Sequence, residues 1–165
     1  MAEVRLAGGC QCGAVRYALH AEPTGASICH CRMCQKAFGS YFAPLTGVPG
    51  DKFEVTRGTV AIFRSSDQVE RGFCRDCGTP LTFHYIGKPR ISVAMGSLDE
   101  PQKYLPLEQF GVESRMPWFA TLAALPGEVS TEDEEPVLAA KIAASNHQHP
   151  DHDTSEWPPE GDAHG

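Results

Sequence analysis

Seven cysteines are the residues whose type and spacing point most directly to chemistry, and all of them fall in three short clusters. The clusters are Cys10-Gln11-Cys12, Cys29-His30-Cys31-Arg32-Met33-Cys34 and Cys74-Arg75-Asp76-Cys77. An odd number of cysteines in such tight groups favours thiolate ligation of a metal over a disulfide framework. Zinc, which takes tetrahedral sets of thiolates, is therefore the first metal expected.

Glycines flank two of these clusters. Residues two apart on a straight strand project to opposite faces, so a C-x-C pair can chelate one ion only where the backbone turns. Gly8, Gly9 and Gly13 next to the first cluster, and Gly78 after the third, supply the freedom that such turns need. The sequence therefore predicts metal-binding turns at both places.

The number of cysteines suggests two kinds of metal site. A structural zinc is closed by four protein ligands, whereas a catalytic zinc keeps one position open. The first and third clusters together offer four thiolates and the second offers three. Spacing leaves this partition open, because loop-closure entropy grows slowly with length and pairing the first cluster with the second costs slightly less.

The three motifs resemble those of the glutathione-dependent formaldehyde-activating enzyme family, which also includes centromere protein V. The resemblance is carried by Gly9–Gly13, Cys29–Gly39 and Phe73–Leu81, with Gly96–Asp99 and Ser114–Phe119 further on. It implies a mainly β, Mss4-like β-tent fold with zinc knuckles. It also implies two zinc ions per chain, a structural one held by Cys10, Cys12, Cys74 and Cys77 and a catalytic one held by Cys29, Cys31 and Cys34.

The resemblance implies a carbon-sulfur lyase that joins glutathione and formaldehyde into S-hydroxymethylglutathione, or cleaves that adduct. Zinc binding deprotonates a thiol, so an open zinc with three cysteine ligands suits delivery of a substrate thiolate to an aldehyde carbon. Three thiolates weaken the Lewis acidity of the metal, which makes thiolate delivery the favoured role over polarisation of the aldehyde. The sequence departs from many family members at Gln35, where they carry a basic residue.

Three alternative interpretations remain open. The second cluster could form another structural zinc site completed by His30, although a histidine between two ligands can also point away from the metal. A redox dithiol at Cys74 and Cys77 is disfavoured, since the βαβ surroundings of such motifs are missing. A non-catalytic, zinc-stabilised binding module of the same fold is the main functional rival. Four basic residues near the motifs, Arg32, Lys36, Arg64 and Arg75, are more often solvated charges than carboxylate-binding groups.

Short runs of β-branched and aromatic residues separated by turn residues must position these cysteines. Only one or two helices are expected, the first over Cys31–Phe38, so the pattern predicts a mostly antiparallel β fold. Alternation places Leu81, Phe83 and Tyr85 on one face, expected to be core, with His84 half exposed on the other. The predicted strands are Val4–Leu6, Ala14–Leu19, Tyr41–Leu45, Lys52–Val55, Thr59–Arg64, Val69–Phe73, Leu81–Ile86 and Ile91–Ala94.

Composition divides the 165 residues into a domain over 1–126 and an acidic tail over 127–165. The first part has a formal charge of +2 and the tail −9, so no positive surface is expected to bind nucleic acid. Thr131 and Glu134 fit a capping box for a helix over about 132–145. The polar stretch from His147 to Asp153 is expected to be solvated, with metal binding the less favoured interpretation.

The sequence also bounds the location and the partners of the protein. It contains neither a secretory signal nor a membrane span, so a cytoplasmic protein is expected. The expected partners are a small thiol such as glutathione and an aldehyde. The oligomeric state and the contacts of the tail have no signature in the sequence.

Overall fold

The computed structural model describes residues 5–127 and 135–157, and within them the fold is mainly β, as predicted. Two α-helices are present, α1 at Arg32–Phe38 and α2 at Pro136–Ser145. Short 3-10 helices lie at Gly50–Lys52, Met95–Ser97, Pro101–Lys103, Val112–Ser114 and Phe119–Ala124. The strands are β1 Leu6–Gly9, β2 Arg16–Leu19, β3 Thr24–Cys29, β4 Ala43–Pro49, β5 Phe53–Arg57, β6 Ala61–Ser66, β7 Val69–Phe73, β8 Pro80–Tyr85, β9 Arg90–Ala94 and β10 Glu108–Phe110.

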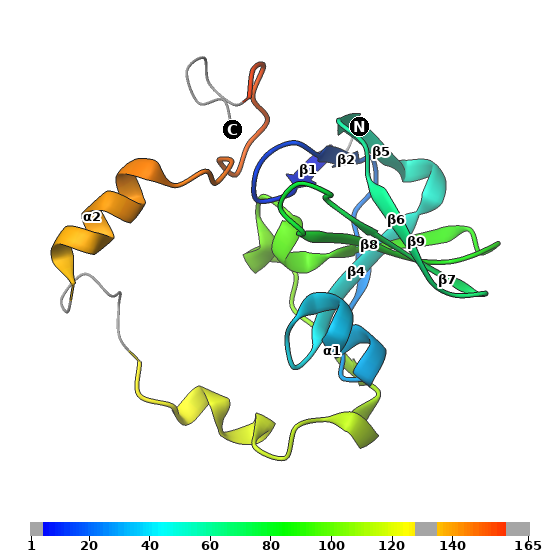
Figure 1. The fold of residues 1–165 in the computed structure, drawn as a ribbon. Coiled ribbons are helices and arrows are strands. Elements are labelled where there is room, and N and C mark those ends of the chain that lie inside the picture. The colour runs from blue at the N-terminus through cyan, green and yellow to red at the C-terminus, as the bar shows by residue number, and fades with distance from the viewer. Residues whose placement is uncertain (1–4, 128–134, 158–165) are drawn as a thin grey trace.

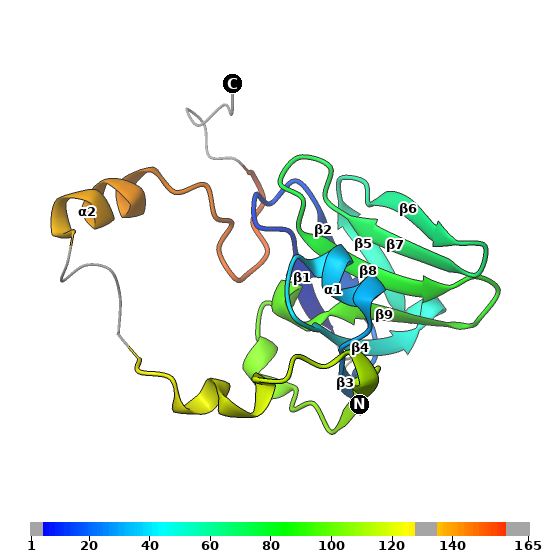
Figure 2. The ribbon, with the colours of Figure 1, turned by 60° about the horizontal axis from the view of Figure 1, so that its bottom comes forward.

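The strands form two sheets that share one core (Figures 1 and 2). The smaller sheet has the order β1-β2-β5, and the larger has the order β10-β3-β4-β9-β8-β7-β6. Neighbouring strands are antiparallel except β10, which runs parallel to β3. This single parallel pair brings the chain after residue 104 back to the end of β3, where Cys29 lies.

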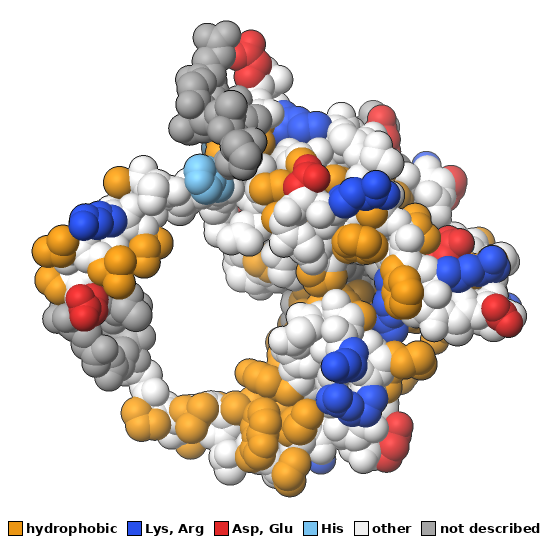
Figure 3. Space-filling model, viewed as in Figure 1, with side chains coloured by type: hydrophobic (Ala, Val, Ile, Leu, Met, Phe, Trp, Pro, Cys, Tyr) orange, Lys and Arg blue, Asp and Glu red, His pale blue; other side chains and the backbone are white. Residues whose placement is uncertain are grey.

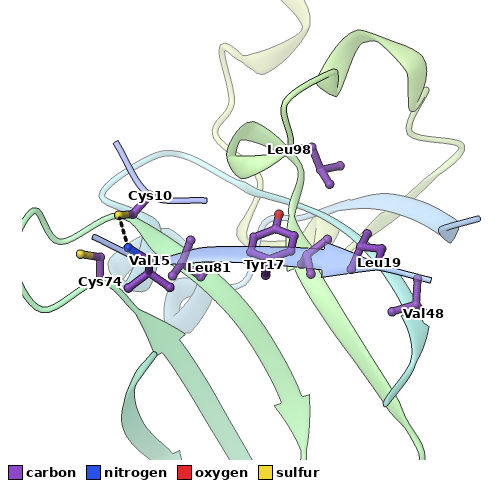
Figure 4. Packing of buried hydrophobic residues seen from close by; sticks show 9 residues of the cluster. Cys10, Val15, Tyr17, Leu19, Val48, Cys74, Leu81 and Leu98 are labelled. Carbon is purple, nitrogen blue, oxygen red and sulfur yellow. Dashed lines mark hydrogen bonds between the residues drawn. The ribbon is translucent and has the colours of Figure 1, made fainter. Parts of the chain in front are cut away.

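Buried apolar residues from both sheets meet in one cluster (Figure 4). Tyr17 and Leu19 of the smaller sheet pack with Leu81 and Val93 of the larger, and none of the four is exposed. The Tyr17 hydroxyl shares a hydrogen bond of 2.8 Å with Ser97 Oγ, which satisfies its polar end within the core. Burial raises the pKa of Tyr17.

The expected core face of β8 is only partly correct. Leu81 is fully buried, but Phe83 is half-buried and Tyr85 is 56% exposed. Phe83 is covered by Tyr85, at 4.9 Å between ring centroids, and by the Arg71 guanidinium at 5.0 Å, instead of by the second sheet. His84 is half-buried, as expected, and its Nε2 bonds the carbonyl of Lys88. The smaller sheet is too short to cover the outer half of β8.

The helix expected in the tail is present as α2, while Thr131 and Glu134 lie outside the described residues. None of its residues is buried, and Leu138 and Ile142 are 52% and 56% exposed. The helix stands away from the sheets in both views (Figures 1 and 2). The apolar side chains of α2 are therefore exposed and contribute nothing to the core of the described structure.

The prediction of a solvated stretch after α2 is wrong for several residues. His149 is only 4% exposed, and its amide bonds the Gln11 carbonyl at 2.7 Å. Trp157 packs on the His149 ring at 4.8 Å between centroids, and its indole N–H bonds the Cys12 carbonyl. A strap consisting of residues 146–157 thus covers the turn at Gly13, where any Cβ would collide with both rings.

Ion pairs hold the same strap to the smaller sheet. Arg16, 3% exposed, makes a bidentate pair with Asp99 at 2.7 and 2.6 Å and a further bond to Asp153 at 2.9 Å. Asp153 also accepts from Arg5. Burial alone would raise the pKa of Asp153, but the hydrogen bonds from Arg16 and Arg5 outweigh it and lower that pKa. Asp99 therefore neutralises the buried Arg16, and the acidic tail adds a second carboxylate through Asp153.

A chain ending at Gly127 is expected to keep the β core and both cysteine clusters but to be less stable by about 2–4 kcal/mol. The loss comes from the half-buried Trp157 and from several strap hydrogen bonds. Urea unfolding of the full and shortened chains measures this difference. Equal midpoints would show that the strap does not pack in solution.

Docking of the strap is expected to weaken below about pH 6.5. Burial, together with the nearby charges of Arg16 and Arg57, lowers the pKa of His149 in the folded state. The undocked histidine therefore takes up a proton first, so its contribution is complete above its unfolded pKa and is lost as pH falls through the lower folded value. Trp157 fluorescence in a Trp118→Phe background reports docking, and His149→Gln should remove this pH dependence.

Candidate metal centres

The structure brings the first and third cysteine clusters together. The sulfur atoms of Cys10, Cys12, Cys74 and Cys77 all lie within 4.8 Å of one another. Cys10 and Cys12 come from the turn between β1 and β2, and Cys74 and Cys77 from the turn between β7 and β8. This group, named the four-cysteine cluster below, therefore joins the two sheets.

Two similar turns shape this cluster. In the first, the Gly13 amide bonds the Cys10 carbonyl at 3.1 Å, and in the second the Gly78 amide bonds the Cys74 carbonyl at 2.9 Å. Both glycines have positive φ, +76° and +78°, which other residues rarely adopt. The predicted metal-binding turns are confirmed as backbone conformations, and the turns aim both pairs of sulfurs at one point.

The sulfur positions fit a tetrahedral zinc ion. Sulfur atoms about 2.3 Å from a tetrahedral zinc must lie about 3.8 Å apart. Cys10 and Cys12 are 3.6 Å apart, and Cys12 and Cys74 are 3.8 Å apart. The Val15 amide also donates to Cys10 Sγ at 3.2 Å, a bond that favours the thiolate (Figure 4).

The thiol pKa values in this cluster diverge. Burial raises the pKa of Cys10, and hydrogen bonds with Cys74 and Cys12 add to that effect. Burial also acts to raise the pKa of Cys77, but donors from Thr79 outweigh it and lower the pKa to about 6. Some of the four thiols therefore keep their protons, and binding of a divalent cation would displace those protons.

The second cluster forms a separate group of three. The sulfurs of Cys29, Cys31 and Cys34 lie within 4.8 Å of one another. Cys29 ends β3, Cys31 is the N-cap residue of α1, and Cys34 lies in the first turn of that helix. The Cys34 amide donates to Cys31 Sγ at 3.4 Å, so a thiol stands where a serine or aspartate oxygen usually caps a helix.

Helix α1 also tunes these thiols. Burial and the Cys34 charge raise the pKa of Cys29 to about 12. Burial acts to raise the pKa of Cys31 as well, but amide donors of the helix start and bonds from its partner thiols outweigh it and lower that pKa. Metal-ligating side chains of the described residues form this three-cysteine cluster and the four-cysteine cluster, and no third group.

His30 does not complete the three-cysteine cluster. Its ring is fully buried, edge-on to Phe119 at 4.7 Å and near Phe42 at 6.1 Å. Its Nε2 donates to the Gln109 side-chain oxygen at 3.0 Å. The ring therefore turns into an aromatic pocket, and a second closed site completed by His30 does not agree with this geometry.

Gln35 is a structural residue in this chain. It is 2% exposed, and its amide nitrogen donates to the carbonyls of His30 at 2.6 Å and Ser114 at 2.9 Å. Its oxygen accepts from Arg32 at 2.6 Å. The glutamine thus ties α1 to the chain that returns after β10, a task that depends on an uncharged amide with both donors and an acceptor.

A pocket of about 410 Å³ lies between α1 and the strands β6 and β7, and none of the three cysteines lines it. Arg71, which lines the pocket and lies 3.5 Å from Cys34 Sγ, connects it to the three-cysteine cluster. Three cations line the pocket, Arg32 and Lys36 of α1 and Arg71 of β7, above an apolar floor that includes Met33 and Phe63. None of these cations pairs with a carboxylate of the described residues. Figure 3 shows Lys and Arg side chains gathered over α1. The pocket therefore offers Arg32 and Lys36, which pair with no carboxylate there, to an anionic ligand, while Arg71 also contacts Cys34 Sγ.

Sequence reasoning missed Arg71. A charged residue on a short strand reads as solvent-facing, yet Arg71 is 7% exposed and its Nη2 lies 3.5 Å from Cys34 Sγ. No spacing signal links it to Cys34, because the contact depends on how β7 crosses α1. Arg64 and Arg75, by contrast, are exposed and do not line this pocket.

The two sheets and the two cysteine clusters define a small β protein with two sites suited to metal ions. The chain belongs to the glutathione-dependent formaldehyde-activating enzyme family, whose sequence model matches residues 5–114. The fold resembles that of a Rhodobacter sphaeroides protein, with a TM-score of 0.52 and 22% identity, over 63% of this chain and 99% of that one.

A curated relative is an uncharacterized lyase of Schizosaccharomyces pombe, 32% identical over 78 residues. The match spans 47% of this chain and 56% of the relative, so the chain matches little more than half of that protein. Within the described residues, no helix is long and apolar enough to cross a membrane.

Proposed function

We propose that this protein is a zinc-dependent carbon-sulfur lyase that forms or cleaves the S-hydroxymethyl adduct of a thiol and an aldehyde. The four-cysteine cluster would hold a closed structural zinc, and Cys29, Cys31 and Cys34 would hold a zinc with one open position. The observation that carries the proposal is the three-cysteine cluster, to which Arg71 connects a cationic pocket. Membership of the family supports the same reaction.

Zinc at the second cluster would supply stabilisation of a substrate thiolate at neutral pH. The protein's own residues would do the rest. The rigid start of α1 fixes Cys31 and Cys34, and the aromatic contacts of His30 fix the backbone between Cys29 and Cys31. The thiolate would therefore meet the aldehyde at a position set by the fold.

Glutathione is the proposed thiol because its two carboxylates match the charge of the pocket. Arg32 and Lys36 lie one turn apart on α1, at the pocket wall, and Arg71 closes it from β7. The apolar floor suits the aliphatic parts of a tripeptide. Formaldehyde, which is small enough to reach a metal-bound sulfur, is the proposed aldehyde. All seven cysteines are free thiols, which agrees with a reducing cytoplasm.

A binding module is the second candidate, and one observation favours it. The chain after the 3-10 helix at Pro101–Lys103 exposes large apolar side chains, with Leu105 73%, Leu107 79% and Leu125 63% exposed. Figure 3 shows orange surface gathered along this part of the chain. A protein partner could cover it. This role does not need an open metal position, which distinguishes it from the lyase.

Metal analysis and thiol titration test the proposal. The lyase should hold two zinc ions per chain, and its cobalt-substituted form should change its thiolate absorption bands when glutathione is added. Initial rates of adduct formation must exceed those of a protein-free control, because the adduct also forms spontaneously. A second metal that resists exchange and does not respond to glutathione, with no rate above the control, would favour the binding module.

A further inference from the structure

Arg71 is held in one orientation by three contacts. Its Nε donates to Ser65 Oγ at 3.3 Å, its Nη2 donates to Cys34 Sγ at 3.5 Å, and its guanidinium lies 5.0 Å from the centre of the Phe83 ring. The side chain is 7% exposed. A guanidinium stacked on an aromatic ring and bonded at two nitrogens has little freedom to turn.

The third nitrogen of this group has no partner. Nη1 is buried and makes no hydrogen bond within the described residues, and Arg71 pairs with no carboxylate there. Buried donors of charged groups are rarely left unpaired, because the loss of water is then uncompensated. An acceptor supplied by a ligand would account for the orphaned nitrogen.

The position of Nη1 indicates which part of a ligand would meet it. Nη1 and Nη2 share one carbon, so an acceptor at Nη1 lies beside Cys34 Sγ and hence beside the three-cysteine cluster. Arg71 also separates the pocket of about 410 Å³ from a neighbouring one of about 290 Å³. Met33, whose side chain is unbranched and 60% exposed, lines the larger of these pockets together with Arg71.

We propose that Nη1 of Arg71 donates a hydrogen bond to the oxygen that becomes negative when a thiolate adds to the aldehyde. This inference rests on the proposed lyase function. The sulfur electron pair forms the carbon-sulfur bond, the carbonyl π pair moves to oxygen, and the oxygen takes a proton from water. The proton that the thiol released to the solvent on binding replaces the one that this water gives up, so no net proton is gained or lost. In the reverse direction the hydroxyl gives up its proton and the carbon-sulfur bond breaks. Arg71 is then a catalytic residue.

The test compares Arg71→Met, Arg71→Lys and the control Arg64→Met, an exposed arginine on the adjacent strand β6 that lines neither pocket. Metal content and circular dichroism are measured first. Loss of one fixed donor should lower kcat for glutathione and formaldehyde by about 100-fold in Arg71→Met. Arg71→Lys should lower kcat less, because the ammonium keeps the positive charge, although it lacks the planar fork that fixes the donors of the guanidinium. Arg64→Met should match the wild type.

A binding measurement gives a readout that does not depend on turnover. Mercaptoacetate carries an oxyanion close to its sulfur, and ethanethiol does not. The cobalt-substituted wild type should bind mercaptoacetate about tenfold more tightly than ethanethiol, and Arg71→Met should abolish this preference while ethanethiol binding changes little. Should Arg71→Met fail to fold, the same two measurements on Arg71→Lys decide.

Three results would overturn the inference. The first is an Arg71 variant that has full metal content and is as fast as the wild type. The second is a variant that keeps the preference for mercaptoacetate over ethanethiol. The third is a variant that loses affinity for both thiols equally. If the wild type neither binds thiols nor exceeds the protein-free rate, the lyase proposal itself fails. A wild type that turns over normally, beside an equally active Arg71→Met, removes only the role of Arg71.

Discussion

Replacing Cys77 by serine is expected to unfold or aggregate the protein. The four-cysteine cluster joins turns that lie more than 60 positions apart and belong to different sheets. Metal binding at a structural thiolate site contributes about 10 kcal/mol or more, which equals the whole stability of many domains. Cys10 and Cys74 would be left buried without a complete ligand set. Size-exclusion chromatography, circular dichroism and metal analysis of the purified variant measure the effect.

Cys31→Ser is the matched control for this variant, since it removes a thiol from the other cluster. A Cys77→Ser protein that keeps native circular dichroism and two zinc ions would contradict the structural assignment. Unfolding by both substitutions would mean that the two clusters are equally structural.

Cys31→Ser itself is expected to leave a folded protein with one tightly bound zinc and no acceleration of adduct formation. The three cysteines lie within one β3-to-α1 connection, so the site organises only local structure. Two remaining thiolates are too few soft ligands to hold zinc firmly. The serine hydroxyl can still accept from the Cys34 amide, so the helix cap survives. A fall in melting temperature of only a few degrees is expected.

The assay for this variant compares initial rates with a protein-free control and includes thiols other than glutathione. Retention of a rate near that of the wild type would refute the catalytic role of the three-cysteine cluster. A variant that loses both zinc ions would show instead that the two sites depend on each other.

The sequence predicted the parts of the fold that local patterns encode. The mainly β class, α1 and the strand β7 follow from residue types and spacing. Gly13 and Gly78 indicated the turns at the first and third clusters correctly, whereas Gly8 and Gly9 lie within β1 and make no turn. Two strands were missed. β3 contains glycine, alanine and serine, which have low strand propensity, and β10 has three exposed residues without alternation. β10 exists only because β3 offers an edge.

The site was predictable as far as its cysteines and no further. Which clusters meet is a property of the sheets, so the count of cysteines suggested the pairing that the structure displays but spacing left it open, and the family resemblance was needed to choose it. Arg71 and His149 carry no periodic signal, and each is buried by a segment distant in sequence. The orientation of the His30 ring likewise depends on its contact with Phe119, a residue that follows β10 in the chain.

The late return of the chain has a consequence for synthesis. The amide of His30 bonds the Phe110 carbonyl, and Gly111 lies so close to Cys31 that a Cβ there would come within 2.7 Å of its amide nitrogen. This cover is translated several seconds after Cys34, at about 5–20 residues per second. During that interval the three thiols of the cluster have been synthesised, but the segment that covers them has not. An oxidant that reached them first would form a disulfide and so remove two of the three thiols that are proposed to hold a metal.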